Sequence, residues 1–307
     1  MTIDLTETTT SAIQDTLMQA RHRLGGPALG MVLTLIIVTD ESGQYDAVRA
    51  ASQAAREHPC RVLGVITRNP AGRSRLDAEI RVGDSGPGET LLLRMHGPLG
   101  QHADSVVAPL VLPDTPVVTW WPGQAPAIPS ADPLGALAQR RVTDAACSDK
   151  PRQLLTALAS GYRPGDTDLS WTRATSWRSL LAATLDQPYA EMTGGTVSAE
   201  QHNPSADLIA TWLAGRLAIP VAREVSDGPG ITEVRFATQE GSITLSRPDG
   251  RTATLSKPGQ SERRVALHRR DTAELLAEEL RRLDPDEVYA EALARFAIHP
   301  IDAGAVA

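Results

Sequence analysis

The chain has 307 residues and a formal net charge of −7, with 41% hydrophobic and 22% charged residues. This length is about twice the ~150 residues of a typical domain, so two domains are expected. The acidic total argues against nucleic acids and anionic membranes as partners, because proteins that bind them usually present a basic face. Two cysteines are too few for a disulfide framework or a thiolate zinc site.

The N-terminal sequence indicates where the protein resides. Its first dozen residues are polar and include Asp4 and Glu7, where an export signal carries positive charge followed by an apolar stretch. The strongest apolar run, residues 31–38, is far shorter than the ~20 residues needed to cross a bilayer. We therefore expect a cytoplasmic protein with no membrane partner.

The first half of the chain alternates apolar runs with helical patterns. Residues 31–38 are almost continuously apolar, as in a strand covered on both faces, and a helical segment then extends to residue 57. A second apolar run at 60–66 completes a βαβ unit, and strands at 78–82 and 90–95 form a hairpin. The further elements expected here are a helix at 106–110, strands at 116–121 and 142–146, and a helix at 153–158.

The second half changes character after the Gly- and Pro-containing linker at 161–166. A helix is expected from Ser170, capped by Asp168 or Ser170, and another is expected to be capped by Ser205. Three short antiparallel strands follow, and two helices that open near Asp271 and Asp284 close the chain. The strand pattern rests on alternating apolar residues at 234–236, 243–245 and 253–255.

These elements predict an α/β fold in two domains. Residues 1–25 form a flexible N-terminal segment and a first helix, and residues 26–163 form an N-terminal domain with a mixed or mostly parallel sheet and flanking helices. Residues 168–300 form a smaller α+β domain with an antiparallel meander.

No assembled catalytic motif is visible. Residues 83–87 look like the segment around a chymotrypsin-type serine, but that fold is all-β, so a turn is expected here. The glycines at 25–30 precede the first strand, whereas a nucleotide-binding loop follows one. The seven histidines show no paired helical spacing. We therefore expect no catalytic residues, no metal and no cofactor.

Two further groups keep alternative interpretations. Arg263, Arg264, Arg269 and Arg270 are candidates for phosphate binding, but a charged strand edge that resists aggregation is the favoured interpretation. Cys60 starts an apolar run, as a small buried hydrophobe does. A redox bridge between Cys60 and Cys147 requires Cα atoms within ~7 Å, which the sequence does not show.

The tryptophans are the strongest candidates for function. Trp212 lies on an apolar helical stripe and is expected in the core. Trp120 and Trp121 end a strand, where open α/β sheets place their sites, and their side chains should point to opposite faces. Tryptophan beside arginine is typical of interface hot spots, although core packing is the favoured interpretation for this group. The other members of this group are Trp171, Trp177 and Arg178.

Several segments resemble the OpcA family of glucose-6-phosphate dehydrogenase assembly proteins. The segments that carry the resemblance are residues 61–66 (RVLGVI), 107–123 (VAPLVLPDTPVVTWWPG), 141–144 (RVTD) and 168–173 (DLSWTR). It implies a non-enzymatic effector that binds glucose-6-phosphate dehydrogenase, favours its active oligomer and supports NADPH production in the oxidative pentose phosphate pathway. In cyanobacterial relatives the effect is linked to thioredoxin, for which this chain offers only Cys60 and Cys147.

From the motifs and the resemblance we derive a hypothetical partner-binding set. Its members are Trp120, Trp121, Pro122, Asp168, Trp171, Arg173, Trp177 and Arg178. The competing hypothesis is a sugar-phosphate-binding sensor or enzyme that uses an Arg-lined cleft; such an enzyme would need a convergent acid/base pair, which the sequence does not display. The oligomeric state is left open.

Overall fold

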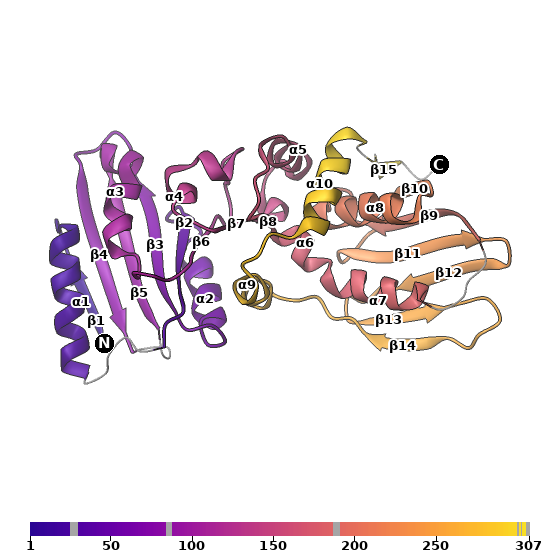
Figure 1. The fold of residues 1–307 in the computed structure, drawn as a ribbon, viewed down its shortest axis with the longest axis horizontal. Coiled ribbons are helices and arrows are strands. Elements are labelled where there is room, and N and C mark those ends of the chain that lie inside the picture. The colour runs from indigo at the N-terminus through magenta and orange to yellow at the C-terminus, as the bar shows by residue number, and fades with distance from the viewer. Residues whose placement is uncertain (25–29, 84–87, 187–190, 300, 302, 305–307) are drawn as a thin grey trace. The chain divides into compact units, whose positions relative to one another are not determined.

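The computed structural model describes residues 1–24, 30–83, 88–186, 191–299, 301 and 303–304 (Figure 1). It is an α/β protein with two compact units, each built on its own sheet. The first unit comprises Met1–Asp144, Arg163–Thr167 and Thr272–Pro285, and the second comprises Ala145–Tyr162, Asp168–Asp271 and Asp286–Ala307. Two glycine-containing segments considered above, residues 25–29 and 84–87, lie outside the described residues.

The first sheet is mostly parallel. Strands β5, β3, β2, β6 and β7 run parallel to one another, while β4 is antiparallel to both β1 and β5. Its eight strands lie in the order β1 (Thr2–Leu5), β4 (Arg75–Val82), β5 (Glu89–His96), β3 (Cys60–Arg68), β2 (Leu33–Thr39), β6 (Val117–Trp120), β7 (Arg140–Thr143) and β8 (Asp166–Asp168).

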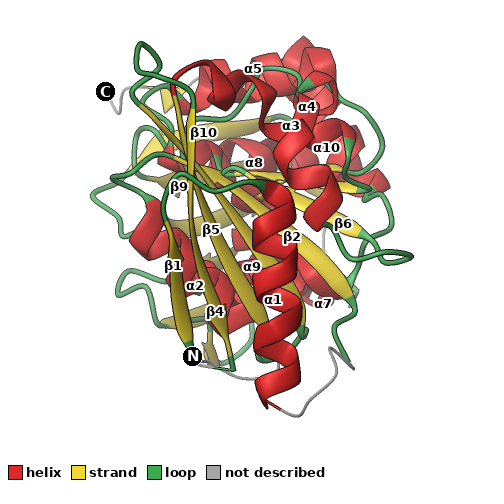
Figure 2. Ribbon diagram, turned by 90° about the vertical axis from the view of Figure 1, so that its left-hand side faces the viewer, coloured by secondary structure: helices red, strands yellow, loops and turns green. Residues whose placement is uncertain are grey.

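Helices cover both faces of this sheet, but unequally. Apolar residues of α1 (Thr10–Leu24), α3 (Ala103–Val107) and α4 (Pro133–Ala136) share a core with β4 and β5, and Figure 2 shows α1 on the near side of the sheet. On the other face α2 (Gln44–Ala54) packs on β2 and β3, and α9 (Thr272–Arg281) packs beside α2. The 3-10 segments are Gly97–His102, Ala108–Leu110, Pro129–Ala131 and Ala145–Cys147.

The second sheet is mostly antiparallel. Strand β10 pairs in parallel with β9 on one side and with β15 on the other, and the remaining strand pairs of the described residues are antiparallel. The spatial order is β14 (Arg263–Ala266), β13 (Thr252–Ser256), β12 (Gly241–Ser246), β11 (Ile231–Thr238), β9 (Met192–Ala199), β10 (Val221–Val225) and β15 (Ala303–Gly304). The helices of this unit are α5 (Pro151–Gly161), α6 (Leu169–Arg173), α7 (Thr175–Leu185), α8 (Pro204–Leu217) and α10 (Glu287–Ile298). Residues of α7 and α8 pack on the apolar face of this sheet.

The predicted fold class is confirmed. The apolar run at 31–38 becomes β2, which is parallel to β3; β4 and β5 pair antiparallel; and β11, β12 and β13 form the expected meander. The edge strand β14 exposes Arg263 and Arg264, in agreement with the charged-edge interpretation.

Several local predictions require correction. The helix expected from Ser170 is split at Ala174 into α6 and α7. The cap of α8 is Asn203 rather than Ser205, because the Asn203 side chain accepts from the Ala206 N–H and Pro204 occupies the first helical position. Helix α10 is likewise capped by Asp286 rather than opened at Asp284.

The ends of the chain also differ from expectation. Residues 2–5, expected in a flexible segment, form β1 and pair with β4, while Ile13 and Leu17 of α1 are buried. Residues 272–285, expected in the C-terminal domain, belong to the first unit. The physical reason is that α9 packs on α2 and its Glu279 pairs with Arg140 of β7.

Candidate functional site

The first sheet has a point where its strand order reverses. Strand β2 lies between β3 and β6 and is parallel to both, so the chain adds strands first on one side and then on the other. In open α/β sheets ligands bind at the carboxyl ends of the strands at such a point. Trp120 ends β6 opposite Ile37 of β2, which places the Trp-Trp-Pro-Gly segment at this edge.

The turn that follows β2 is acidic. The Asp40 carboxylate accepts hydrogen bonds from the Gly43 N–H and the Ser42 hydroxyl, both at 2.8 Å, and these bonds lower its pKa. The neighbouring Glu41 pairs with Arg68 at the end of β3. Two carboxylates therefore stand where a dinucleotide fold presents a glycine-rich loop to pyrophosphate. The residues present do not fit a dinucleotide cofactor at this edge.

Trp120 and Trp121 are core residues. Their exposed fractions are 0% and 1%, and Pro122 is half-buried. The Trp121 ring lies against Gly135, where an added Cβ would come within 3.1 Å of the indole. The Trp120 Nε1 atom is buried and has no hydrogen-bond acceptor among the described residues. These two rings are therefore fixed by packing rather than presented to solvent.

Asp168 organises the start of α6 in the second unit. One oxygen of its carboxylate accepts from the Ser170 N–H at 2.8 Å, and the other accepts from the Ala145 N–H at 2.9 Å. The predicted capping role of Asp168 is therefore confirmed. The carboxylate is fully buried, so it acts within the fold.

Trp171 is the centre of an aromatic cluster in the same unit. Its Nε1 donates to the Asp286 carboxylate at 2.8 Å, and the rings of Tyr289 and Trp212 lie at centroid distances of 6.0 and 6.5 Å. The guanidinium of Arg178 stacks over the indole, with Cζ 3.7 Å from the ring centroid. The predicted pairing of tryptophan with arginine thus exists, with a half-buried Arg178 above a buried Trp171.

Trp177 has a different arginine neighbour. Arg247 lies 5.0 Å from its ring centroid and donates to the carbonyls of Leu267 and Ile231. Burial, together with the nearby charge of Arg269, lowers the pKa of Arg247 to about 10. Trp177 is 2% exposed, so this pair also belongs to the core.

The structure divides the predicted partner-binding set between the two units. Trp120, Trp121 and Pro122 belong to the first unit, and the other members belong to the second. All four tryptophans of the set are buried, while Pro122, Arg173 and Arg178 are half-exposed. The sequence did not identify Asp286, although its position just before a helical pattern is a capping signal.

The two cysteines differ in environment and belong to different units. Cys60 is fully buried at the start of β3, and burial raises the pKa of its thiol to about 12. Cys147 is exposed. Among the described residues there is no cluster of three or more His, Cys, Asp or Glu side chains arranged to hold a metal ion. In the same residues we find no helix with the length and apolar character needed to span a membrane.

Solved structures with similar folds are distant in sequence. A 3-ketoreductase from Actinomadura kijaniata, in complex with NADP and TDP-benzene, shares 10% identity over 87% of this chain and 95% of its own, with a TM-score of 0.49. An oxidoreductase from Sinorhizobium meliloti shares 12% identity over 86% of each chain, with a TM-score of 0.47. A comparison with curated proteins found no significant match.

Two protein-family models match most of the chain. One, described as the N-terminal domain of the glucose-6-phosphate dehydrogenase subunit, matches residues 51–160. The other, described as the C-terminal domain of the same protein, matches residues 164–293. The two matches follow one another in the order that their descriptions give. The chain therefore belongs to the OpcA family of glucose-6-phosphate dehydrogenase assembly proteins.

Proposed function

We propose that this chain is a non-enzymatic assembly factor that binds glucose-6-phosphate dehydrogenase, favours its active oligomer and raises its activity. The observation that carries the proposal is the pair of consecutive family matches, both described as domains of a glucose-6-phosphate dehydrogenase subunit. NADPH production in the oxidative pentose phosphate pathway, in the cytoplasm, is the process that such a factor supports.

The chemistry of the first sheet supports a non-enzymatic role. The edge at which α/β sheets usually bind cofactors carries Asp40 and Glu41, which repel a pyrophosphate. The Gly43 N–H, which a phosphate would use at the start of α2, is already bonded to Asp40. The partner, rather than this chain, then supplies the hydride-transfer chemistry.

The effect on the dehydrogenase follows from differential binding. An effector shifts an equilibrium between two states only by as much as its affinities for them differ. Typical coupling free energies are about 1–3 kcal/mol, equivalent to about 5–150-fold in the equilibrium constant. A modest preference of this chain for the active oligomer is enough to populate it.

Each unit offers half-exposed residues beside a buried indole. Pro122 follows Trp121 in the first unit, and Arg178 stacks on Trp171 in the second. We assign partner contact to Pro122, Arg173 and Arg178, and to the buried tryptophans the role of holding these residues in place. This assignment keeps the sequence-derived set but gives its members two different roles.

The decisive experiment is a titration of purified glucose-6-phosphate dehydrogenase from the same organism with this chain. NADPH formation and the mass of the dehydrogenase oligomer are measured across the titration. Activity and oligomer mass should rise together and saturate at a fixed ratio of the two proteins.

The control is this chain alone with glucose 6-phosphate and NADP. Turnover in that control would show that the chain is an enzyme. If dehydrogenase activity and oligomer mass stay unchanged at a saturating concentration of this chain, the chain is not an assembly factor.

A further inference from the structure

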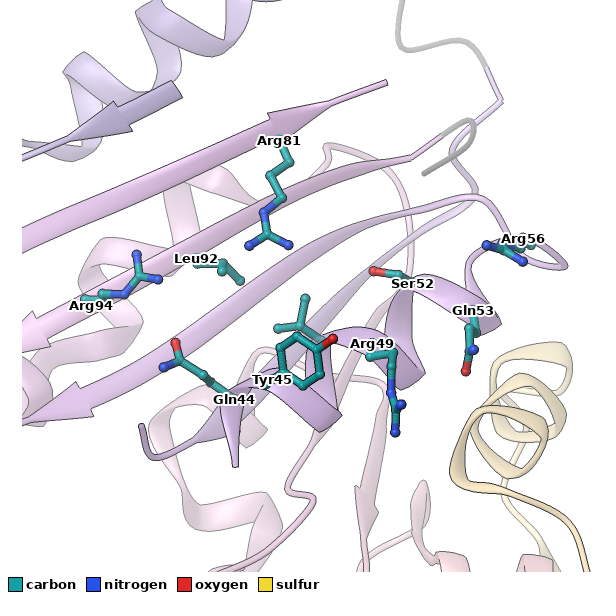
Figure 3. A pocket seen from close by; sticks show the side chains of 10 residues that line it. Gln44, Tyr45, Arg49, Ser52, Gln53, Arg56, Arg81, Leu92 and Arg94 are labelled. Atoms are coloured by element: carbon teal, nitrogen blue, oxygen red, sulfur yellow. The ribbon is translucent and has the colours of Figure 1, made fainter. Parts of the chain in front are cut away.

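A hollow of about 490 Å³ lies on the α2 side of the first sheet (Figure 3). One wall is α2 together with the residues that follow it, and the other is formed by β4 and β5. Figure 3 shows Arg81 and Arg94 on the strand side, Tyr45 and Ser52 on the helix side, and Leu92 between them. Every one of these residues belongs to the first unit.

Side-chain alternation explains why the hollow is polar. In β4 the even-numbered residues from Leu76 to Val82 are buried against α1, so Glu79 and Arg81 point to the opposite face. Helix α2 covers β2 and β3 on that face but leaves β4 and β5 open beside it. Leu92 is buried at the floor, next to Gly64, where an added Cβ would lie 2.9 Å from the leucine side chain.

The lining is rich in arginine. Four arginines are among its lining residues: Arg49, Arg56, Arg81 and Arg94. Arg81 and Arg94 share a single carboxylate, that of Glu79, at 2.6 and 3.0 Å. Arg49 pairs with Asp46 at 3.1 Å, and Figure 3 shows it directed away from the strands. Arg56 is exposed and forms no ion pair with the described residues.

This positive charge is local. The whole chain carries a net charge of −7, yet the four arginines of the hollow contact only two carboxylates among the described residues. A guanidinium offers five N–H donors, and those of Arg81 and Arg94 are only partly used by Glu79. An anion with several oxygens would fill the remaining donor positions.

We propose that this hollow binds a small phosphate-bearing ligand, of the sugar-phosphate or nucleotide class. The planar donor fork of arginine matches phosphate oxygens in a bidentate manner. A volume of about 490 Å³ lies within the ~300–1,000 Å³ range of small-molecule sites. The exposed Tyr45 supplies an aromatic face, and Ser52 and Gln53 supply polar groups for the remainder of such a ligand.

The test measures binding to the isolated full chain by calorimetry, so it does not depend on the dehydrogenase. The probes are glucose 6-phosphate, NADP and inorganic phosphate, with glucose as the uncharged control. Arg56→Ser combined with Arg81→Gln should weaken binding of the phosphate probes at least tenfold. Glu79→Gln should strengthen it, because it removes the carboxylate that competes for Arg81 and Arg94. Arg23→Ser, an exposed arginine on α1, should leave it unchanged.

Each outcome decides the proposal. If circular dichroism shows that the double variant is unfolded, binding is measured with Arg56→Ser alone, because Arg56 is exposed and its replacement should not disturb the fold. Absence of binding by all three phosphate probes, or binding that the Arg56 and Glu79 variants do not change, overturns the proposal. Loss of dehydrogenase binding in the arginine variants, without any phosphate binding, would show that the hollow receives the partner protein instead.

Discussion

Arg140 on β7 and Glu279 on α9 form a buried ion pair although 139 positions separate them in the sequence. The side chains are 5% and 6% exposed, and Arg140 also donates to the Asp284 carbonyl at 2.8 Å. With the packing of α9 on α2, this pair joins residues 272–285 to the rest of the first unit. The first unit is thus complete only when residues 272–285 are in place.

Removing Glu279 should destabilise the first unit strongly. Glu279→Ala leaves a buried guanidinium without its carboxylate, which costs about 3–5 kcal/mol of unfolding free energy. The control is Arg281→Ser on the same helix, whose pair with Glu57 is exposed and should contribute below ~1 kcal/mol. Denaturant unfolding measures both variants, and similar losses in the two would contradict the assigned role of the buried pair.

The two thiols should differ in reactivity. Because burial raises the pKa of Cys60 to about 12, its thiol stays protonated and covered at neutral pH, whereas Cys147 is accessible. Mass spectrometry after N-ethylmaleimide treatment should show one rapid addition in the native chain and none in Cys147→Ser. Rapid labelling of Cys60 in the folded chain would contradict this expectation.

The raised pKa of Cys60 also has a consequence for alkaline stability. Between the ordinary thiol pKa of 9.0 and about 12, the unfolded chain loses this proton and the folded chain keeps it. Stability should therefore fall as pH rises above about 9. Cys60→Ala should show a smaller decline than the natural chain in denaturant titrations over this range.

Glu79 should contribute to folding stability with a pH dependence opposite to that of Cys60: its contribution is lost as pH falls. Burial by itself raises its pKa, but hydrogen bonds and charges from Arg94 and Arg81 outweigh burial and lower it below 4.5. Its stabilising contribution is then full above pH 4.5 and lost as pH falls through the lowered value. Glu79→Gln should be about 1–2 kcal/mol less stable than the natural chain at pH 7. That gap should narrow as pH falls from 4.5 through the lowered pKa of Glu79, and a gap independent of pH would contradict the ion-pair explanation.

Variants at Trp171 and Arg178 should separate packing from partner contact. Trp171→Ala removes the centre of the aromatic cluster and should lower the unfolding free energy by about 3–5 kcal/mol. Arg173→Ser with Arg178→Ser should keep the fold but weaken dehydrogenase binding about tenfold, or ~1.4 kcal/mol. Arg216→Ser, an exposed arginine of the same unit, is the matched control for binding. Normal activation by the double arginine variant would exclude these residues as contacts.

Much of the sheet architecture was predictable because it depends on local pattern. A continuous apolar run such as residues 31–38 needs cover on both faces, so a parallel strand in a layered fold was the expected solution. The short strand β8 was not predictable, since all three of its residues are polar and yet buried. It is held by a pair between Arg141 and Asp166 and by a bond from Thr143 to the Thr167 carbonyl.

The candidate site was also predictable only in part. Local sequence correctly placed Trp120 at a strand end and Asp168 at a helix cap. The residues that bury Trp171 were not predictable, because its indole is covered by Tyr289 and bonded to Asp286, 115 positions away. The arginine hollow was missed for a related reason: its lining comes from a helix and two strands, and none of these segments is unusually basic by itself.

The sequence by itself determined the α/β class, the meander, most helices and the family, since periodicity, turn chemistry and segment resemblance all reside in short stretches of chain. Only the tertiary structure decided that the tryptophans of the partner-binding set are buried, that residues 272–285 complete the first unit, and that four arginines line one hollow. Burial and charge pairing depend on which remote segments cover a residue, and that information is absent from any single stretch.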